Sequence, residues 1–206
     1  MYIESARGSG PYFANLGARR DSLFQRLALG QDIPLAAGYR INSFKKENSP
    51  LDYYQTVLTN RGIWLLHMLR FLMFDYETGS DATFLKFARE LGLHINNKTF
   101  ANVDLIRLAE KHYGQPLDWF FRSWLYGGFM PEFNVTWSAQ QRDGNWYVPV
   151  QVLVNKTTPD FTMPVICRVS AGDENKFARQ TVSGSSTTFE LRSEEHTSEL
   201  QSRQVI

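Results

Sequence analysis

The clearest amphipathic pattern in the chain runs from Pro50 to Phe74. Its apolar residues recur at steps of three and four positions, which is the period of one face of an α-helix. They are Leu51, Tyr54, Leu58, Leu65, Met68 and Leu72, with a second row of Val57, Trp64 and Phe71 beside them. A helix with two apolar rows is buried on most sides. The pattern therefore predicts a central buried helix with a proline in its first turn.

A narrow polar stripe follows the same predicted helix. At about 100° per residue, its members project within roughly a quarter-turn of one another. They are Asp52, Thr56, Thr59, Asn60, His67 and Arg70. Such a stripe either meets solvent or polar partners, as most polar stripes do, or it lines a cleft. The pattern leaves both interpretations open.

Helical periodicity recurs on both sides of this segment. We expect helices over residues 11–29, 81–91, 102–113 and 117–125, separated by glycine- and proline-containing turns. Gly92, with Asn96 and Asn97 after it, is expected to end the second of these helices, and Gly114 is expected to end the third. Asn102 or Thr99 is expected to cap the start of the third.

After Pro131 the spacing of apolar residues changes from 3.6 to 2, which is typical of β-strands. Strands are expected over residues 133–137, 146–154, 163–169, 177–182 and 186–191. Short strands separated by turns favour an antiparallel sandwich. The sequence thus predicts an α+β protein with a helical part, residues 1–130, and a partial β-sandwich, residues 131–191.

Three motifs occur in order between residues 39 and 133. They are the run from Tyr54 to Arg70, the segment Asp118-Trp-Phe-Phe-Arg-Ser-Trp124, and a closing Gly128-Phe-Met-Pro131. This ordered set resembles zinc aminopeptidases of the aminopeptidase N type. The resemblance implies a multidomain fragment: the α-helical C-terminal part of a thermolysin-like catalytic domain, followed by an incomplete antiparallel β-sandwich.

The chain departs from the family pattern at the catalytic position. The family usually reads Tyr-x-Lys-Gly, and its tyrosine donates a hydrogen bond to the oxyanion. Here Thr59 takes the place of that tyrosine and Arg61 that of the lysine, directly before Gly62. The resemblance implies that Thr59 marks lost or altered catalysis. It also makes Tyr53, Tyr54 and Asn60 candidate residues of the substrate cleft.

The histidines and the single cysteine do not form a recognisable metal-binding motif. His67, His94, His112 and His196 are scattered, and no His-Glu-x-x-His is present. Glu4 lacks the Asn-Glu-Gly surroundings of the family's third ligand. We therefore expect zinc to bind in a longer parent protein. We expect this chain to supply no set of metal ligands and to bind no metal. Met1 is then expected to be an internal start or a truncation. The sequence does not indicate in which cellular compartment the protein acts.

Composition excludes several classes of function. The chain has 22 basic and 21 acidic residues, a net charge of +1, which gives no electrostatic basis for binding nucleic acid. No stretch of about 18 apolar residues is free of charge, so no transmembrane segment is expected. Cys167 is the one cysteine, which excludes an internal disulfide and favours a small core residue over a nucleophile.

Residues 192–202 lack the strand alternation of the preceding segment. They read Arg-Ser-Glu-Glu-His-Thr-Ser-Glu-Leu-Gln-Ser, which matches the translation of a common sequencing adapter. We interpret residues 192–206 as an artefactual tail and expect nothing of them in the fold. The natural sandwich is then expected to continue beyond Leu191.

Three functional hypotheses follow. The chain is part of a zinc metallopeptidase, a hydrolase, and supplies the wall of a cleft that binds peptide substrate, without activity of its own. Alternatively, it belongs to a non-catalytic peptidase-like protein that binds peptides or protein partners. The third hypothesis sets the resemblance aside and reads a helical domain joined to a β-sandwich as an interaction module.

Overall fold

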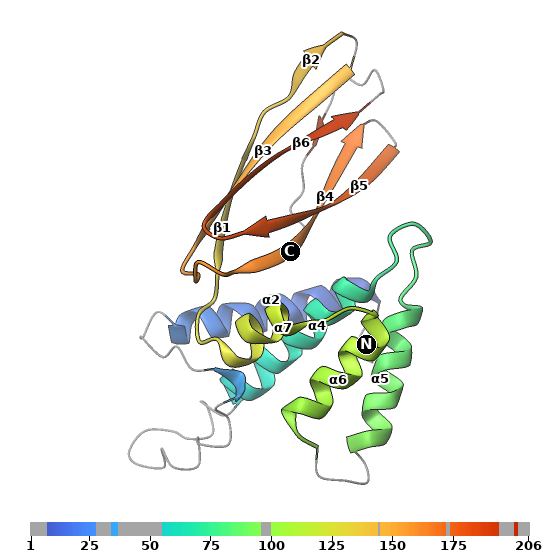
Figure 1. Ribbon diagram of the computed structural model, residues 1–206, viewed down its shortest axis with the longest axis vertical. Coiled ribbons are helices and arrows are strands. Elements are labelled where there is room, and N and C mark those ends of the chain that lie inside the picture. Colours follow the sequence, from blue (N-terminus) through green and yellow to red (C-terminus); the bar gives the residue numbers. More distant parts are fainter. Residues whose placement is uncertain are drawn as a thin grey trace. The chain divides into compact units, whose positions relative to one another are not determined.

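The computed structural model describes residues 8–27, 34–36, 55–95, 100–143, 145–171, 174–193 and 200–201. The chain divides into two compact units, Met1–Phe129 and Met130–Ile206. The first unit is helical and the second consists of antiparallel strands (Figure 1). The expected α+β class is therefore confirmed.

The helical unit contains five α-helices and two π-helical turns among its described residues. They are α2 (Ser9–Leu27), the π turn η2 (Gln55–Arg61), α4 (Gly62–Met73), α5 (Ala82–Ile95), α6 (Asn102–Tyr113), α7 (Asp118–Phe121) and the π turn η3 (Arg122–Tyr126). The predicted central helix is confirmed from Gln55 to Met73, while residues 50–54 lie outside the described part. Its first seven described residues form η2, whose hydrogen bonds run from i to i+5. Angles counted at 100° per residue therefore do not hold for Thr59 and Asn60.

The ends of the helices follow the sequence expectations only in part. Gly114 ends α6 as predicted: its φ is +81°, and its N–H donates to the carbonyl oxygen of Glu110 at 2.8 Å. The prediction that Gly92 ends a helix is wrong, because α5 continues to Ile95. A glycine within a helix costs only about 1 kcal/mol, which the surrounding turns can offset.

The predicted caps of α6 also need correction. Asn102 is the first residue of the helix, and the capping position belongs to Ala101. Alanine has no side-chain acceptor for the first N–H groups of the helix, and the side-chain contact here is the reverse one: the carboxylate of Asp104 accepts the Ala101 N–H at 2.9 Å. Thr99, the alternative cap, lies outside the described residues.

The core of the helical unit is rich in leucine and aromatic side chains. Its largest fully buried side chains are Leu65, Leu69, Phe87, Leu117, Phe120 and Phe121. Trp124 and Leu125 are buried as well, as expected of aromatic-rich helices that pack against one another. Each such side chain contributes about 1.5–3 kcal/mol on burial. This core positions α4 among α2, α5 and α6.

Among its described residues, the second unit contains two antiparallel sheets. Its strands are β1 (Glu132–Trp137), β2 (Gln140–Arg142), β3 (Asn145–Asn155), β4 (Thr162–Ala171), β5 (Glu174–Ser183), β6 (Ser186–Ser193) and β7 (Leu200–Gln201). The long strand β3 pairs with β1, β2 and β6, and β4 pairs with β5 and β7. All five predicted strands are present. The sequence did not predict β2, because Gln140-Gln-Arg142 offers no apolar alternation.

Alternation along β3 builds the core of this unit. Val148, Val150, Val152 and Val154 are buried, whereas Gln151, Leu153 and Asn155 between and beyond them are exposed. Val150 lies opposite Phe189 of β6, and Val152 lies opposite Val135 of β1. The buried faces thus come from β-strands whose side chains alternate with a period of two.

The segment excluded from the expected fold takes part in the strands. β6 runs to Ser193, two residues past the expected end at Leu191. Arg192 lies opposite Tyr147 in register, and its guanidinium carbon is 5.8 Å from the centre of the Tyr147 ring. Leu200 and Gln201 pair with the end of β4.

Candidate functional site

Helix α2 packs along η2 and α4 and runs antiparallel to α4 (Figure 1). Three polar contacts join the helices in reverse order along the chain. They link Arg19 to Asn60, Leu16 to Trp64 and Tyr12 to His67. Tyr12, Leu16 and Arg19 are spaced by four and three positions, so they lie on one face of α2.

Asn60 is the one predicted cleft residue whose partner is described. Its Oδ1 accepts a hydrogen bond from Nη1 of Arg19 at 2.8 Å. The Nε of Arg19 also donates to Oδ1 of Asn15, at 2.8 Å. Arg19 therefore holds Asn60 against α2 from within the helical unit.

His67 lies among three aromatic rings. The hydroxyl of Tyr12 is 2.9 Å from Nδ1 of His67. The rings of Tyr12, Phe13 and Trp64 meet the imidazole edge to face, with centres 5.7, 6.2 and 5.4 Å away. Such edge contacts stabilise packed aromatic clusters. His67 thus packs α4 against α2.

Arg70 ends the stripe with an ion pair. Its Nε donates to Oδ1 of Asp81 at 2.9 Å, and its Nη2 contacts Oδ2 of the same carboxylate. The two side chains are 17% and 22% exposed, so the pair is largely shielded from water. The guanidinium carbon also lies 5.5 Å from the centre of the Tyr12 ring. Arg70 thereby connects α4 to α2 and to the residue before α5.

Thr59 is half-buried in η2, next to Asn60. Tyr53 and Tyr54 lie outside the described residues, and the side chain of Thr56 is not described. For Asn60, His67 and Arg70, the stripe meets polar partners inside the helical unit, which is the first of its two interpretations. The structure therefore brings three stripe residues together with α2 and leaves Thr59 as the candidate catalytic position.

Arg61 is a residue whose structural role the sequence did not indicate. It is 4% exposed, and its guanidinium donates to three consecutive carbonyl oxygens after η3. The distances are 2.5 Å to Gly127, 3.1 Å to Gly128 and 3.4 Å to Phe129. The sequence singles out Arg61 only because it takes the position of the family's lysine. That position does not indicate that its hydrogen-bond partners lie 66 to 68 residues later in the chain.

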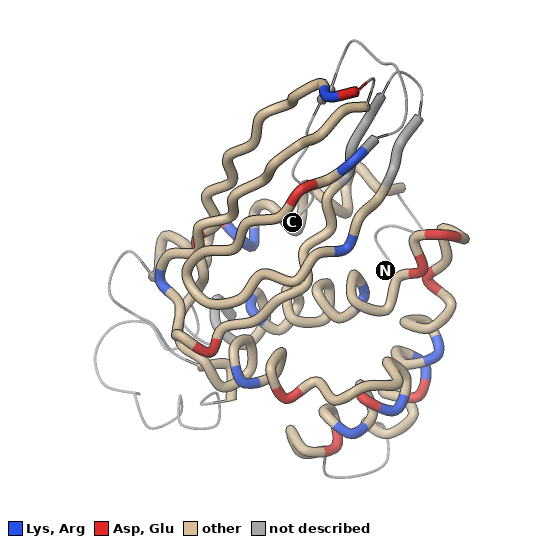
Figure 2. The backbone as a smooth tube through the Cα atoms, turned by 45° about the horizontal axis from the view of Figure 1, so that its top comes forward, with Lys and Arg blue, Asp and Glu red and all other residues tan. Residues whose placement is uncertain are grey.

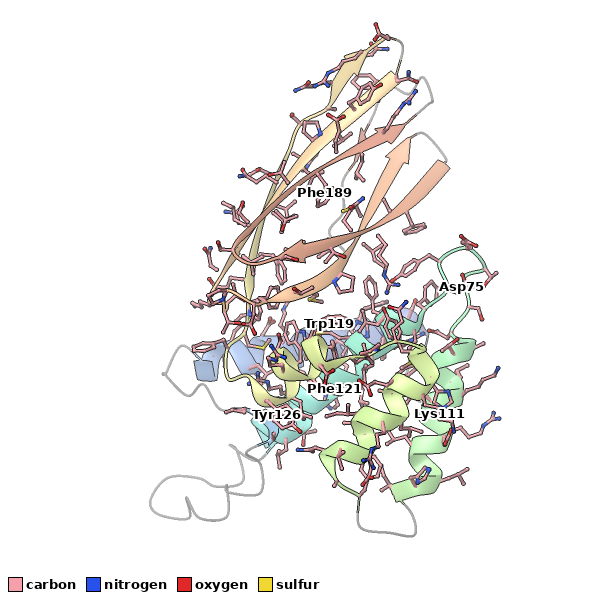
Figure 3. All side chains as sticks on the ribbon, viewed as in Figure 1. Asp75, Lys111, Trp119, Phe121, Tyr126 and Phe189 are labelled. Carbon is pink, nitrogen blue, oxygen red and sulfur yellow. The ribbon has the colours of Figure 1, made fainter. Side chains whose placement is uncertain are left out.

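A second polar cluster joins α5 to α6. Lys111, which lies beside α5 in Figure 3, donates to both oxygens of Glu90 at 2.6 and 2.9 Å. Nε2 of His112 is 2.8 Å from the same carboxylate. The hydrogen bonds from Lys111 and then His112 lower the pKa of Glu90 from 4.5 to about 2. This cluster holds the two helices together.

Charge gives no second candidate for a binding surface on α5 and α6. Acidic and basic residues are interspersed along α5 and α6 (Figure 2). In unit 2, burial raises the pKa of the Cys167 thiol, which disfavours the thiolate form that nucleophilic chemistry needs.

The described residues do not fit a zinc site. Within them, no three side chains of His, Cys, Asp or Glu converge closely enough to hold a metal ion. The ligands of the implied zinc therefore have no counterpart in the described part of the chain. Among the described helices, none has the length and apolar character needed to cross a bilayer.

No protein-family model matches the chain, and no curated protein matches it significantly. Functional inference therefore depends on the motifs and on the geometry given above.

Proposed function

We propose that the chain is part of a zinc metallopeptidase of the aminopeptidase N type, and that η2, around Thr59, forms part of the wall of its peptide-binding cleft. The ordered motifs between residues 39 and 133 support this proposal. The succession of a helical unit and an antiparallel β unit is in keeping with it. The observation that carries it is the position of Thr59, half-buried in a π-helical turn. Turns of this kind are frequent at functional sites.

The proposed role of this chain is to shape the cleft. Zinc in the parent protein would activate the water that attacks the peptide carbonyl. The described residues supply no ligand set for it, so no catalytic step is assigned to this chain alone. A tyrosine hydroxyl reaches further than the hydroxyl of Thr59. We therefore expect weak stabilisation of the oxyanion and slow turnover by the parent protein.

A second candidate function is a peptidase-like protein that binds peptides without cleaving them. The substitution at Thr59 favours it, because the threonine hydroxyl reaches less far than that of the tyrosine. The side chains of Asn60 and His67 are engaged by Arg19 and Tyr12 of α2, so they do not distinguish the two candidates. Peptide binding without hydrolysis would support this candidate over the first.

The test uses the full-length protein encoded by the natural gene. Turnover of an aminoacyl amide is measured for wild type, Thr59→Tyr and Thr59→Ala at equal zinc loading. Restoring one oxyanion donor in good geometry is expected to raise kcat by up to about 100-fold in Thr59→Tyr. If wild type turns over at an ordinary enzymatic rate and Thr59→Ala leaves it unchanged, position 59 is not catalytic.

The isolated 206-residue chain provides the control. It is expected to lose zinc on dialysis against a weak chelator and to leave aminoacyl reporters uncleaved. Stoichiometric zinc retained after dialysis would contradict the proposed division of roles between this chain and the rest of the parent protein.

A further inference from the structure

One side chain joins the π-helical turn η2 to the loop that follows the second π-helical turn, η3. Arg61 is the last residue of η2, and the carbonyl groups it contacts follow directly after η3. Its Nη1 donates to Gly128, and its Nη2 donates to Gly127 and Phe129. The contacts connect positions 66 to 68 residues apart in the chain.

The burial of Arg61 makes these contacts strong determinants of local structure. A guanidinium that is 4% exposed has little access to water, so carbonyl groups must take the place of its hydration. Its rigid fork of donors suits several acceptors at once, and hydrogen bonds from a charged donor are stronger than neutral ones. Moving the loop away would leave a buried charge poorly solvated.

The loop starts in close contact with the backbone of η3. Gly127 follows η3 with an extended backbone, at φ −75° and ψ 145°. A Cβ atom at this position would lie 2.4 Å from the carbonyl oxygen of Ser123, well inside the closest tolerated contact. Glycine is therefore required here because any side chain would push the loop away from η3.

We infer that Arg61 is a positioning residue that fixes η2, with Thr59 and Asn60, against the loop Gly127–Phe129. Its importance for catalysis rests on the proposed function, whereas the mechanical coupling of the two turns does not. Arginine, unlike lysine, can contact three carbonyl groups with one planar fork. Arg61→Lys should therefore keep the charge and recover only part of the coupling.

Amide hydrogen exchange of the 206-residue chain tests the coupling. Wild type is compared with Arg61→Gln, Arg61→Lys, Gly127→Ala and the control Arg20→Gln, whose side chain is 53% exposed. We expect exchange at 55–61 and 122–129 to rise about tenfold or more in Arg61→Gln, by less in Arg61→Lys, and not in the control. Gly127→Ala should also accelerate amide exchange at residues 55–61, although the substitution lies in the loop after η3, because displacing that loop removes the acceptors of Arg61.

The inference would be overturned if Arg61→Lys and Gly127→Ala each changed amide exchange in only one of the two segments, 55–61 or 122–129. This comparison remains possible if Arg61→Gln fails to fold. In the full-length protein, a positioning role predicts lower kcat with nearly unchanged KM in Arg61→Gln, and partial rescue in Arg61→Lys. Equal losses in both variants, proportional to unfolding, would indicate a merely structural role. Absence of turnover in every variant, with the exchange pattern intact, would refute the proposed function and leave the coupling established.

Discussion

The hydroxyl of Tyr12 lies 2.9 Å from Nδ1 of His67 and joins two helices whose residues are 55 positions apart. Of the three polar contacts between α2 and the central helix, this one lies nearest the N-terminal end of α2. Polar contacts of this kind fix the register of two helices more sharply than apolar packing does, because a shifted register leaves donors and acceptors unpaired. The polar stripe therefore directs how α2 packs.

Replacing Tyr12 by phenylalanine isolates the contribution of this hydrogen bond. Tyr12→Phe keeps the ring contacts with His67 and Arg70 and removes the hydroxyl, so we expect a loss of about 1 kcal/mol in the free energy of unfolding. Urea unfolding measures it. Tyr126→Phe is the matched control, because the Tyr126 side chain is 49% exposed and its change should stay within about 0.5 kcal/mol. Equal effects of the two variants would contradict this assignment.

The ion pair between Arg70 and Asp81 should couple α4 to the start of α5. A double-mutant cycle with Arg70→Met and Asp81→Asn is expected to give a coupling energy of about 1–3 kcal/mol, since both groups are largely shielded. The exposed pair Arg20–Asp21 should give less than about 0.5 kcal/mol in the same experiment. A coupling near zero for Arg70 and Asp81 would mean that water screens the pair after all.

Two glycines of neighbouring helices should respond oppositely to alanine. Gly92→Ala should raise the free energy of unfolding by about 0.5–1 kcal/mol, because position 92 lies within α5 and a Cβ there meets no atom within 4 Å. Gly114→Ala should lower it by about 1 kcal/mol, because Gly114 has a φ of +81° that side chains disfavour. Thermal or urea unfolding of both variants checks the signs. The same sign for both would show that one helix end is misplaced.

The Glu90 cluster predicts a stability change in acid. The hydrogen bonds from Lys111 and His112 lower the pKa of Glu90 to about 2 in the folded protein, below its ordinary value of 4.5. The ionised carboxylate therefore stabilises the fold above pH 4.5, and this contribution is lost as the pH falls toward 2. Glu90→Gln should melt below wild type at pH 7, and the difference should shrink across this window. Glu77→Gln, at an exposed position, should follow wild type at every pH.

Two truncations separate the end of β6 from the rest of the tail. Removing residues 194–206 deletes two positions that pair with β4 and should change Tm by less than about 3 °C. Removing residues 192–206 also deletes Arg192 and Ser193, which pair with Tyr147 and Trp146, and should lower Tm further. Equal Tm values for the two truncated chains would mean that the last two residues of β6 contribute nothing. Natural codons that differ from the adapter would independently remove the interpretation of residues 192–206 as an artefact.

Local patterns determined the order of elements in this protein. The change of period after Pro131 and the rows containing Leu65 and Val150 depend only on which side of a helix or strand faces a core, so the α+β class and five strands follow from the sequence. Gly114 also behaved as predicted, because its positive φ is a property of the helix end itself. The sequence likewise offered Thr59 as the candidate position through a short motif.

Tertiary structure decided which polar groups meet. Nothing near Arg61 in the chain reveals that its partners are the carbonyl groups of Gly127 to Phe129, because those contacts arise only when η2 meets the loop that follows η3. The same holds for Asn60 and His67, whose partners come from α2. A stripe of polar residues has one period whether it faces water, a ligand or another helix. Only packing distinguishes these environments, since the free energy of a buried polar group depends on the partner that replaces its water.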